Sequence, residues 1–180
     1  MKINKTFIED LLIIEPQLYK DDRGFFYESY NKNNLDKVIN IVFVQDNESK
    51  SNKGVVRGLH FQLPPFEQTK LVRCVSGKIL DVVVDLRTNS KTYGKSFSIE
   101  LSSENNKQLF VPKGFAHGFQ VLSEEAIVNY KVDNFYNTKS ESGIIWNDKD
   151  LSIDWNRDIK PVLSDKDLKL DLFKNLKSPF

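Results

Sequence analysis

The chain has 180 residues, which is enough for one domain with a sizeable hydrophobic core. Apolar residues make up 39% of it, so it is not a disordered tail, and 26 Lys and Arg against 25 Asp and Glu leave a net charge of +1, which excludes a histone-like basic nucleic-acid-binding protein. No apolar run approaches the roughly 18–20 residues of a membrane helix, and no signal-peptide core follows the N-terminus. We therefore expect a soluble cytoplasmic protein with neither nucleic-acid nor membrane partners.

Taken in chain order, the sequence predicts short strands rich in Val, Ile, Leu, Phe and Tyr. The expected strands cover residues 25–30, 41–45, 55–61, 71–75, 79–86, 96–101, 108–111, 118–122 and 127–132. Turn signals separate them, for example at residues 21–24, 47–54, 76–77 and 102–106. Many strands at this spacing, without helical segments between them, indicate one all-β sandwich or barrel domain over residues 1–180.

Helix is scarce in the sequence. Residues 33–39 and 164–176 are the best candidates, and the second begins with Ser164 as an N-cap followed by Asp167 three positions later. We expect these two helices to be short and peripheral.

Few side chains are available for catalysis or metal binding. Cys74 is the only cysteine, which excludes an intrachain disulfide and a cysteine-based zinc site. His60 and His117 are the only histidines, so an ordinary general base that titrates near neutral pH is expected to be one of these two. A metal site with three histidine ligands is impossible, and a metal could use at most these two histidines together with carboxylates. The simpler expectation is a protein without a metal or other cofactor.

The first informative segment is Val-Val-Arg-Gly-Leu-His-Phe-Gln at residues 55–62. Strict alternation along a strand would place Arg57 and His60 on opposite faces. Gly58 lies between them and permits a β-bulge that turns both side chains to one face. A surface arginine and a structural histidine are the alternative interpretation of this segment.

A second segment, Pro112-x-Gly114-x-x-His117, joins with Gly54-x5-His60 to resemble the two motifs of the cupin superfamily. That resemblance implies an all-β cupin jelly-roll barrel with a few short peripheral helices. Metal-binding cupins carry His-x-His in the first motif, whereas this chain has Gln62 at the second position. The resemblance therefore points to a barrel without a metal, in which a histidine base, a tyrosine acid and a cation would activate the substrate.

A longer series of motifs carries a closer resemblance. In order, they occupy residues 22–30, 43–47, 56–62, 70–73, 81–87, 112–119, 146–148 and 163–167. Together they resemble the dTDP-4-dehydrorhamnose 3,5-epimerase family over nearly the whole chain. That family acts on a dTDP-linked 4-keto-6-deoxyhexose, inverting C3 and C5 by removal and return of protons, without a redox cofactor.

The resemblance also implies roles for individual residues. His60 would be the base, Tyr130 the acid on the opposite side of the sugar, and Lys70 the cation near the C4 oxygen. Asp167 would orient His60, with Asp81 as a second candidate for a nearby carboxylate. Thr69 departs from the glycine or alanine that usually precedes the lysine. The implied substrate-binding residues are Arg23, Phe26, Glu28, Gln45, Asn47, Arg57, His117, Tyr136, Glu141 and Lys166.

Two of these binding residues have more specific expectations. Tyr136 resembles the residue that stacks on thymine, although Phe135 stands where tyrosine is common. His117 either contacts the sugar or braces the barrel. The family assembles as a homodimer in which an N-terminal strand reaches the partner, so Arg23 and Glu28, within residues 1–30, would complete the partner's pocket.

Several functions remain compatible with the residues. The nearest alternatives are a 3- or 5-epimerase acting on one centre, or a 3,4-ketoisomerase on a related nucleotide sugar, although Tyr130 argues against the ketoisomerase. A non-catalytic sugar-binding cupin would keep the barrel without needing both base and acid. A metal-dependent isomerase or oxygenase is disfavoured by Gln62. The nucleotide, the number of centres inverted and the deoxysugar pathway stay open.

Overall fold

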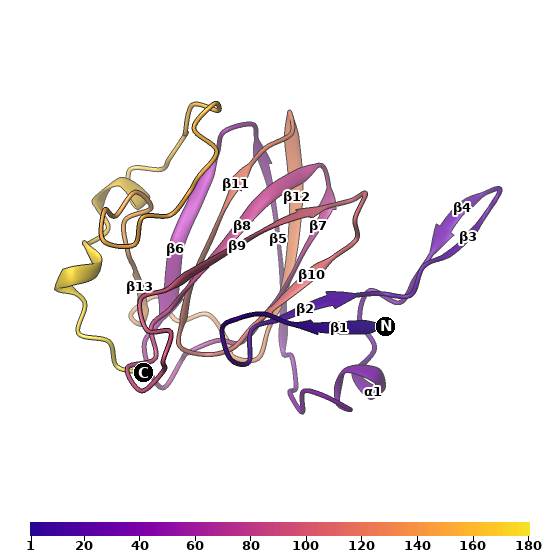
Figure 1. Cartoon of the computed structure of the whole chain (residues 1–180), viewed down its shortest axis with the longest axis horizontal. Coiled ribbons are helices and arrows are strands. Elements are labelled where there is room, and N and C mark those ends of the chain that lie inside the picture. Colours follow the sequence, from indigo (N-terminus) through magenta and orange to yellow (C-terminus); the bar gives the residue numbers. More distant parts are fainter.

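The computed structural model describes residues 1–180, and antiparallel strands make up most of its regular structure (Figure 1). The strands are β1 (Lys2–Lys5), β2 (Leu12–Glu15), β3 (Tyr19–Asp21), β4 (Gly24–Phe26), β5 (Gln45–Asn52), β6 (Val56–Gln62), β7 (Lys70–Ser76), β8 (Lys78–Asp85), β9 (Ser96–Ser102), β10 (Gln108–Val111), β11 (Phe115–Val121), β12 (Glu125–Val132) and β13 (Glu141–Gly143). The helical elements are α1 (Lys32–Leu35) and two 3₁₀ turns, η1 (Asp167–Lys169) and η2 (Phe173–Asn175).

Two sheets form the barrel. The first has six strands in the order β1-β2-β10-β7-β12-β5, and the second has five in the order β13-β6-β11-β8-β9. All pairings between these strands are antiparallel. This arrangement confirms the predicted all-β jelly-roll barrel.

The main core lies between the two sheets because alternate side chains of each strand point inward. Val72 and Val128 of the six-stranded sheet pack in one cluster with Val83 and Phe119 of the five-stranded sheet. Each such side chain contributes about 1.5–3 kcal/mol when it is fully buried. The apolar core closes one part of the barrel interior and leaves the remainder for polar side chains.

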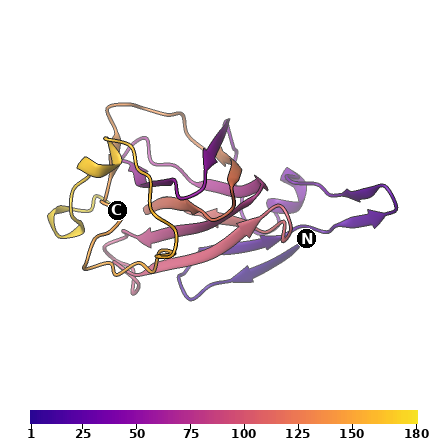
Figure 2. The same ribbon diagram turned by 90° about the horizontal axis from the view of Figure 1, so that it is seen from above.

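Long connections cover the outer faces of both sheets. The segment after β13 places Leu151 and Trp155 against the outer face of the five-stranded sheet, around Val82 and Val84. Figure 2 shows this C-terminal segment on the side of the barrel away from the N-terminal hairpin. The region around α1 similarly covers part of the six-stranded sheet.

The region of β5 differs from the sequence prediction. Residues 41–44 are not in a strand, and residues 47–52, predicted as part of a turn, form most of β5. β5 pairs with β12 over eight residues, and its mostly polar sequence alternates between exposed and more buried positions. A strand whose inner face lines a polar cavity does not need apolar alternation, which is why its composition resembled a turn.

The predicted helix at residues 164–176 was also wrong. The segment is mostly extended and contains only η1 and η2. Its N-cap contact is nevertheless present, since Ser164 Oγ accepts a hydrogen bond from the backbone N–H of Asp167 at 3.1 Å. A bridge between Asp171 and Ile144 ties the segment to the barrel, so its backbone hydrogen bonds do not all remain local. The helix predicted at residues 33–39 is reduced to α1, and none of the helices has the length and apolar character needed to cross a membrane.

The hairpin of β3 and β4 projects away from the barrel (Figures 1 and 2). All six residues in its strands are exposed. Three large apolar side chains on it, Tyr19, Phe25 and Phe26, have exposed fractions of 55–68%. The hairpin therefore presents apolar surface that this chain does not cover.

Candidate active site

The polar part of the barrel interior encloses an open cavity of about 340 Å³, a size suited to a small ligand. Residues from both sheets and from the C-terminal segment line it. Nine of the predicted site residues meet there: Arg57, His60, Lys70, His117, Tyr130, Tyr136, Glu141, Lys166 and Asp167. The structure thus brings together residues that are up to 110 positions apart in the sequence, counting from Arg57 to Asp167 (167 − 57).

A β-bulge turns Arg57 and His60 toward this cavity. In the pairing of β6 with β11, His60 is opposite His117 and Arg57 is opposite Phe119, so β6 contains one extra residue between these positions. Gly58 lies in the bulge with φ +110°, and a Cβ atom there would come within 2.6 Å of the Gly118 Cα atom. The bulge predicted from the sequence is confirmed, and it requires glycine at this position.

His60 forms a pair with Asp167. The Nε2 atom of His60 lies 2.5 Å from Asp167 Oδ1, and the Asp167 side chain is only 7% exposed. Burial alone would raise the pKa of Asp167, but the hydrogen bond and charge of His60, with Ser164 and Lys166, bring it below its usual value. An ionised carboxylate only accepts hydrogen bonds, so His60 donates from Nε2 and keeps Nδ1 as its basic nitrogen.

Tyr130 reaches the cavity from β12 in the opposite sheet. It is half-buried, and this burial raises the pKa of its phenol, although the nearby positive charge of Arg57 opposes the increase. The phenol consequently keeps its proton at neutral pH and can act as a donor. Base and acid candidates are therefore held on two different sheets around one cavity.

Lys70 is the first residue of β7 and also lines the cavity. Desolvation lowers the pKa of its ammonium group to about 8, while the negative charges of Asp81 and Glu141 resist this decrease. The preceding Thr69 is buried, and its backbone N–H donates to Asp133 Oδ1 at 2.6 Å. Thr69 is thus buried and held through its backbone, and the lysine that follows it still lines the cavity.

A second histidine–carboxylate pair lies deeper in the barrel. The Nε2 atom of His117 is 2.7 Å from Asp81 Oδ1, and both side chains are almost completely buried. Asp81 was a candidate neighbour of His60, but its hydrogen bond goes to His117 instead. Each of the two histidines thus has its own carboxylate partner.

Three polar groups form a cluster near the mouth of the cavity. The Tyr136 hydroxyl donates to Glu141 Oε2 at 2.5 Å, and Lys166 Nζ lies 2.6 Å from the same oxygen. Burial favours a raised pKa for Glu141, but the contacts with Lys166 and Tyr136 bring it below its ordinary value. Tyr136 is 53% exposed, so its ring is accessible to a planar ligand.

Gln62, which occupies the second histidine position of the metal-binding cupin motif, holds the loop that carries Tyr136. Its Nε2 atom donates to the carbonyl oxygens of Phe66 at 2.6 Å and Phe135 at 3.2 Å, and its Oε1 atom accepts from the Asn137 N–H at 2.7 Å. All its polar atoms are thus used, two bonds fixing the loop of Tyr136 and one fixing the loop between β6 and β7. No group of three or more His, Cys, Asp or Glu side chains is arranged to hold a metal ion.

Gln45 and Asn47 lie next to the cavity without lining it. Gln45 Nε2 donates to Asn47 Oδ1 at 2.8 Å, and Gln45 Oε1 accepts a long hydrogen bond from the Tyr136 N–H at 3.4 Å. Asn47 is directly opposite Tyr130 in the β5–β12 pairing. Both residues are therefore close to predicted site residues.

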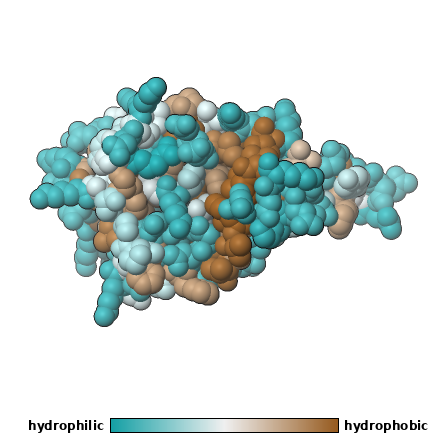
Figure 3. Space-filling view, turned by 90° about the horizontal axis from the view of Figure 1, so that it is seen from below, coloured by the Kyte–Doolittle hydropathy of each residue, from teal (hydrophilic) through white to brown (hydrophobic).

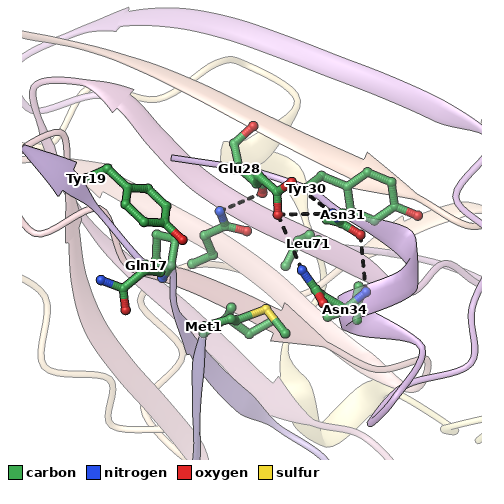
Figure 4. A pocket seen from close by; sticks show the side chains of 13 residues that line it. Met1, Gln17, Tyr19, Glu28, Tyr30, Asn31, Asn34 and Leu71 are labelled. Carbon is green, nitrogen blue, oxygen red and sulfur yellow. Dashed lines mark hydrogen bonds between the residues drawn. The ribbon is translucent and has the colours of Figure 1, made fainter. Parts of the chain in front are cut away.

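Arg23, Phe26 and Glu28 lie away from this cavity, on and beside the projecting hairpin. Arg23 pairs with Asp21 in the hairpin turn, and Phe26 is exposed. Glu28 lines a separate small pocket, where its carboxylate accepts hydrogen bonds from the side chains of Asn31 and Asn34 (Figure 4). A single chain does not bring these three residues to the other nine.

The cavity also includes residues that the sequence analysis did not select. Ser49 lines it from β5, two residues beyond Asn47 on the same face of the strand, and Gln68 precedes Lys70 at the start of β7. Ser49 was missed because its segment was interpreted as a turn. Alternation along a polar strand is the signal that could have identified it.

Comparison with known proteins identifies the family to which this chain belongs. A model of the dTDP-4-dehydrorhamnose 3,5-epimerase family matches residues 5–175. The dTDP-4-dehydrorhamnose 3,5-epimerase of Shigella flexneri is 52% identical over 170 residues, which are 93% of each chain.

Two solved structures resemble this chain both in sequence and in fold. The Bacillus anthracis dTDP-4-dehydrorhamnose 3,5-epimerase, with TDP and PPi bound, is 49% identical with a TM-score of 0.93, covering 96% of this chain and 99% of that one. The Legionella pneumophila dTDP-6-deoxy-D-glucose-3,5-epimerase, in complex with dTDP-4-keto-L-rhamnose, is 45% identical with a TM-score of 0.91, covering 96% and 93%. This protein belongs to the dTDP-4-dehydrorhamnose 3,5-epimerase family.

Proposed function

We propose that this protein is an isomerase that inverts C3 and C5 of dTDP-4-dehydro-6-deoxy-D-glucose, giving dTDP-4-dehydro-L-rhamnose. The observation that carries this proposal is the meeting of His60, Asp167, Tyr130 and Lys70 at one cavity. These side chains supply a base, its orienting carboxylate, an acid and a cation, which are the groups that epimerisation beside a ketone requires.

Proton removal is assigned to His60. The C4 carbonyl acidifies the hydrogens on C3 and C5, so a neutral imidazole is strong enough to remove one of them. Asp167 holds the Nε2–H of His60, which leaves Nδ1 to accept the substrate proton. The same carboxylate then stabilises the imidazolium that forms.

Return of a proton from the other face of the sugar completes the inversion. Tyr130 is the donor, since its phenol remains protonated at neutral pH and comes from the opposite sheet. Between the two steps the substrate is an enolate with negative charge on its C4 oxygen, and the Lys70 ammonium stabilises that charge. Only protons move, so electrons balance without a hydride acceptor.

The nucleotide part of the substrate is assigned to the mouth of the cavity. The exposed guanidinium of Arg57 and the ammonium of Lys166 suit a diphosphate, and the open ring of Tyr136 suits stacking on a base. We assign Gln45, Asn47 and Glu141 as further hydrogen-bonding groups for the nucleotide, and His117 as a contact of the sugar. The TDP bound to the Bacillus anthracis relative supports a dTDP-linked substrate.

A homodimer would complete the site. The projecting hairpin carries Arg23 and Phe26 away from its own barrel and ends close to Glu28, which is the arrangement expected if it reaches a partner's cavity. A second copy would also cover the exposed apolar side chains of the hairpin, and Figure 3 shows a band of hydrophobic residues crossing one face beside it. We place this dimer in the cytoplasm.

Solvent-exchange measurements test the proposed reaction. Purified protein is incubated with the 4-keto sugar nucleotide in deuterated water, and the product is examined by NMR for deuterium and configuration at C3 and C5. The wild type should incorporate deuterium and invert both centres, and His60→Ala should abolish incorporation at both. Unchanged exchange in His60→Ala would contradict the assignment of His60 as the base. Inversion at only one centre by the wild type would indicate a single-site epimerase.

A tyrosine pair separates catalysis from simple sugar binding. Tyr130→Phe should strongly reduce inversion, whereas Tyr93→Phe, which packs against Phe173 away from the cavity, should not. If Tyr130→Phe left activity intact, the acid assignment would be wrong. If the wild type bound the nucleotide sugar without any exchange, the non-catalytic sugar-binding cupin would be the better description.

A further inference from the structure

The buried carboxylate of Asp81 is not used by the mechanism above. Asp81 lies on β8 with no exposed surface, and its only hydrogen bond joins Oδ1 to Nε2 of His117 at 2.7 Å. Its second oxygen, Oδ2, is buried without a hydrogen-bond partner in the protein. A carboxylate oxygen without a partner is costly in a protein interior, so a positive charge nearby would be favourable.

Lys70 is a cation of the barrel interior that has no close anionic partner. It enters the interior from β7 of the opposite sheet, and it makes no ion pair within 4 Å. Among the charges around it, Asp81 has the largest effect in keeping its proton, ahead of Glu141. The other titratable or charged groups that face the same cavity are His60 and Arg57 of β6, His117 of β11, Tyr130 of β12, Tyr136, and Lys166 and Asp167 of the C-terminal segment.

We propose that Asp81 is a positioning residue for the epimerisation: fixed by His117 through one oxygen, it is the counter-charge that keeps Lys70 an ammonium ion inside the barrel. His117, which lines the cavity, limits the rotation of the carboxylate, and the free oxygen leaves negative charge in the barrel interior that the Lys70 ammonium can balance. The inference rests on the proposed function, because its purpose is to keep the cation that stabilises the enolate.

The protonation state of Lys70 decides whether it can stabilise the enolate. A lysine that loses hydration tends to lose its proton, and neutral Lys70 could not stabilise an enolate. A direct ion pair would keep the proton but would also occupy the ammonium and hold it away from substrate. A carboxylate that is not in direct contact with Lys70, and is itself held by His117, favours the charge while leaving the ammonium hydrogens free for the C4 oxygen.

The pH dependence of kcat for Asp81→Asn tests the inference. The substitution keeps the shape of the side chain and removes its charge, so the alkaline limb of the profile should move to lower pH by about 1–3 units, the effect expected for one nearby opposite charge. Glu100→Gln removes a negative charge from the neighbouring strand β9, where it is paired with Lys78 on the surface, and should leave the limb in place.

His117→Asn provides a second, independent variant. It removes the imidazole but keeps the Asp81 charge, so kcat should fall while the alkaline limb stays in place or moves to higher pH. If Asp81 and His117 had only a structural role, both substitutions would lower kcat, and the alkaline limb would stay at the same pH in both variants. An unmoved limb in Asp81→Asn, or a limb moved to lower pH in His117→Asn, would overturn the inference, whereas an inactive wild type would instead overturn the proposed function.

Discussion

His60 and Asp167 are joined at 2.5 Å although 107 residues separate them in the chain. Bridges between Val55 and Val162 and between Ile144 and Asp171 tie the C-terminal segment to the barrel on both sides of Asp167. The pair is therefore assembled by the segment that also covers the outer face of the five-stranded sheet. Formation of the proposed base therefore depends on docking of the C-terminal segment.

Asp167→Asn should lower kcat by about 100-fold or more, because an amide neither fixes the basic tautomer nor stabilises the imidazolium. The KM should change little, since Asp167 is not assigned to nucleotide binding. Steady-state kinetics on the 4-keto sugar nucleotide provide the measurement. Asp165→Asn, an exposed acid two residues earlier, is the matched control and should behave as wild type. Equal kinetics for the two variants would contradict the role of the pair.

The projecting hairpin predicts complementation between two inactive variants. In the proposed homodimer, Arg23→Ala removes a hairpin residue and His60→Ala removes the proposed base, so each variant alone should have little activity. A heterodimer purified by two different tags contains one site with both an intact hairpin and an intact base, and should recover about half of the wild-type activity. If each chain completed its own site, the heterodimer would be as inactive as its parents.

The sequence predicted local features better than those that depend on distant pairing. The strand 108–111 agrees with β10, and Gly58 between Arg57 and His60 was a sufficient signal for the bulge. The polar strand β5 was missed because its inner face lines a cavity instead of a core. Asp167 could be connected with His60 only through the family resemblance, since no local pattern joins residues so far apart.

Gln62 leads to a prediction about substrate affinity. Gln62→Met has a similar volume but loses the two hydrogen bonds that hold the loop of Tyr136, together with a third to the Phe66 carbonyl, so KM should rise by about tenfold, the equivalent of roughly one net hydrogen bond. The kcat should be affected less, because Gln62 makes no hydrogen bond to the proposed base or acid. Gln17→Met, at an exposed position, is the control. An unchanged KM would show that the loop is fixed by other contacts.

Lys70 links activity to a cost in stability. The pKa of its ammonium falls from 10.5, the value expected in an unfolded chain, to about 8 in the fold. Between these values the unfolded chain binds more protons than the folded one, so the free energy of unfolding should rise as pH increases through this window. Below pH 8 the full cost is present, on the order of 3 kcal/mol.

Lys70→Met should remove that cost together with the cation. Urea unfolding at pH 7 should show the variant to be more stable than wild type by up to about 3 kcal/mol, and the difference should shrink as pH approaches 10.5. Its epimerase activity should be nearly lost. Lys149→Met, at an exposed lysine, should change neither property. A Lys70→Met protein that is less stable than wild type at pH 7 would mean that the ammonium makes a net stabilising contribution to the fold, contrary to the desolvation that lowers its pKa.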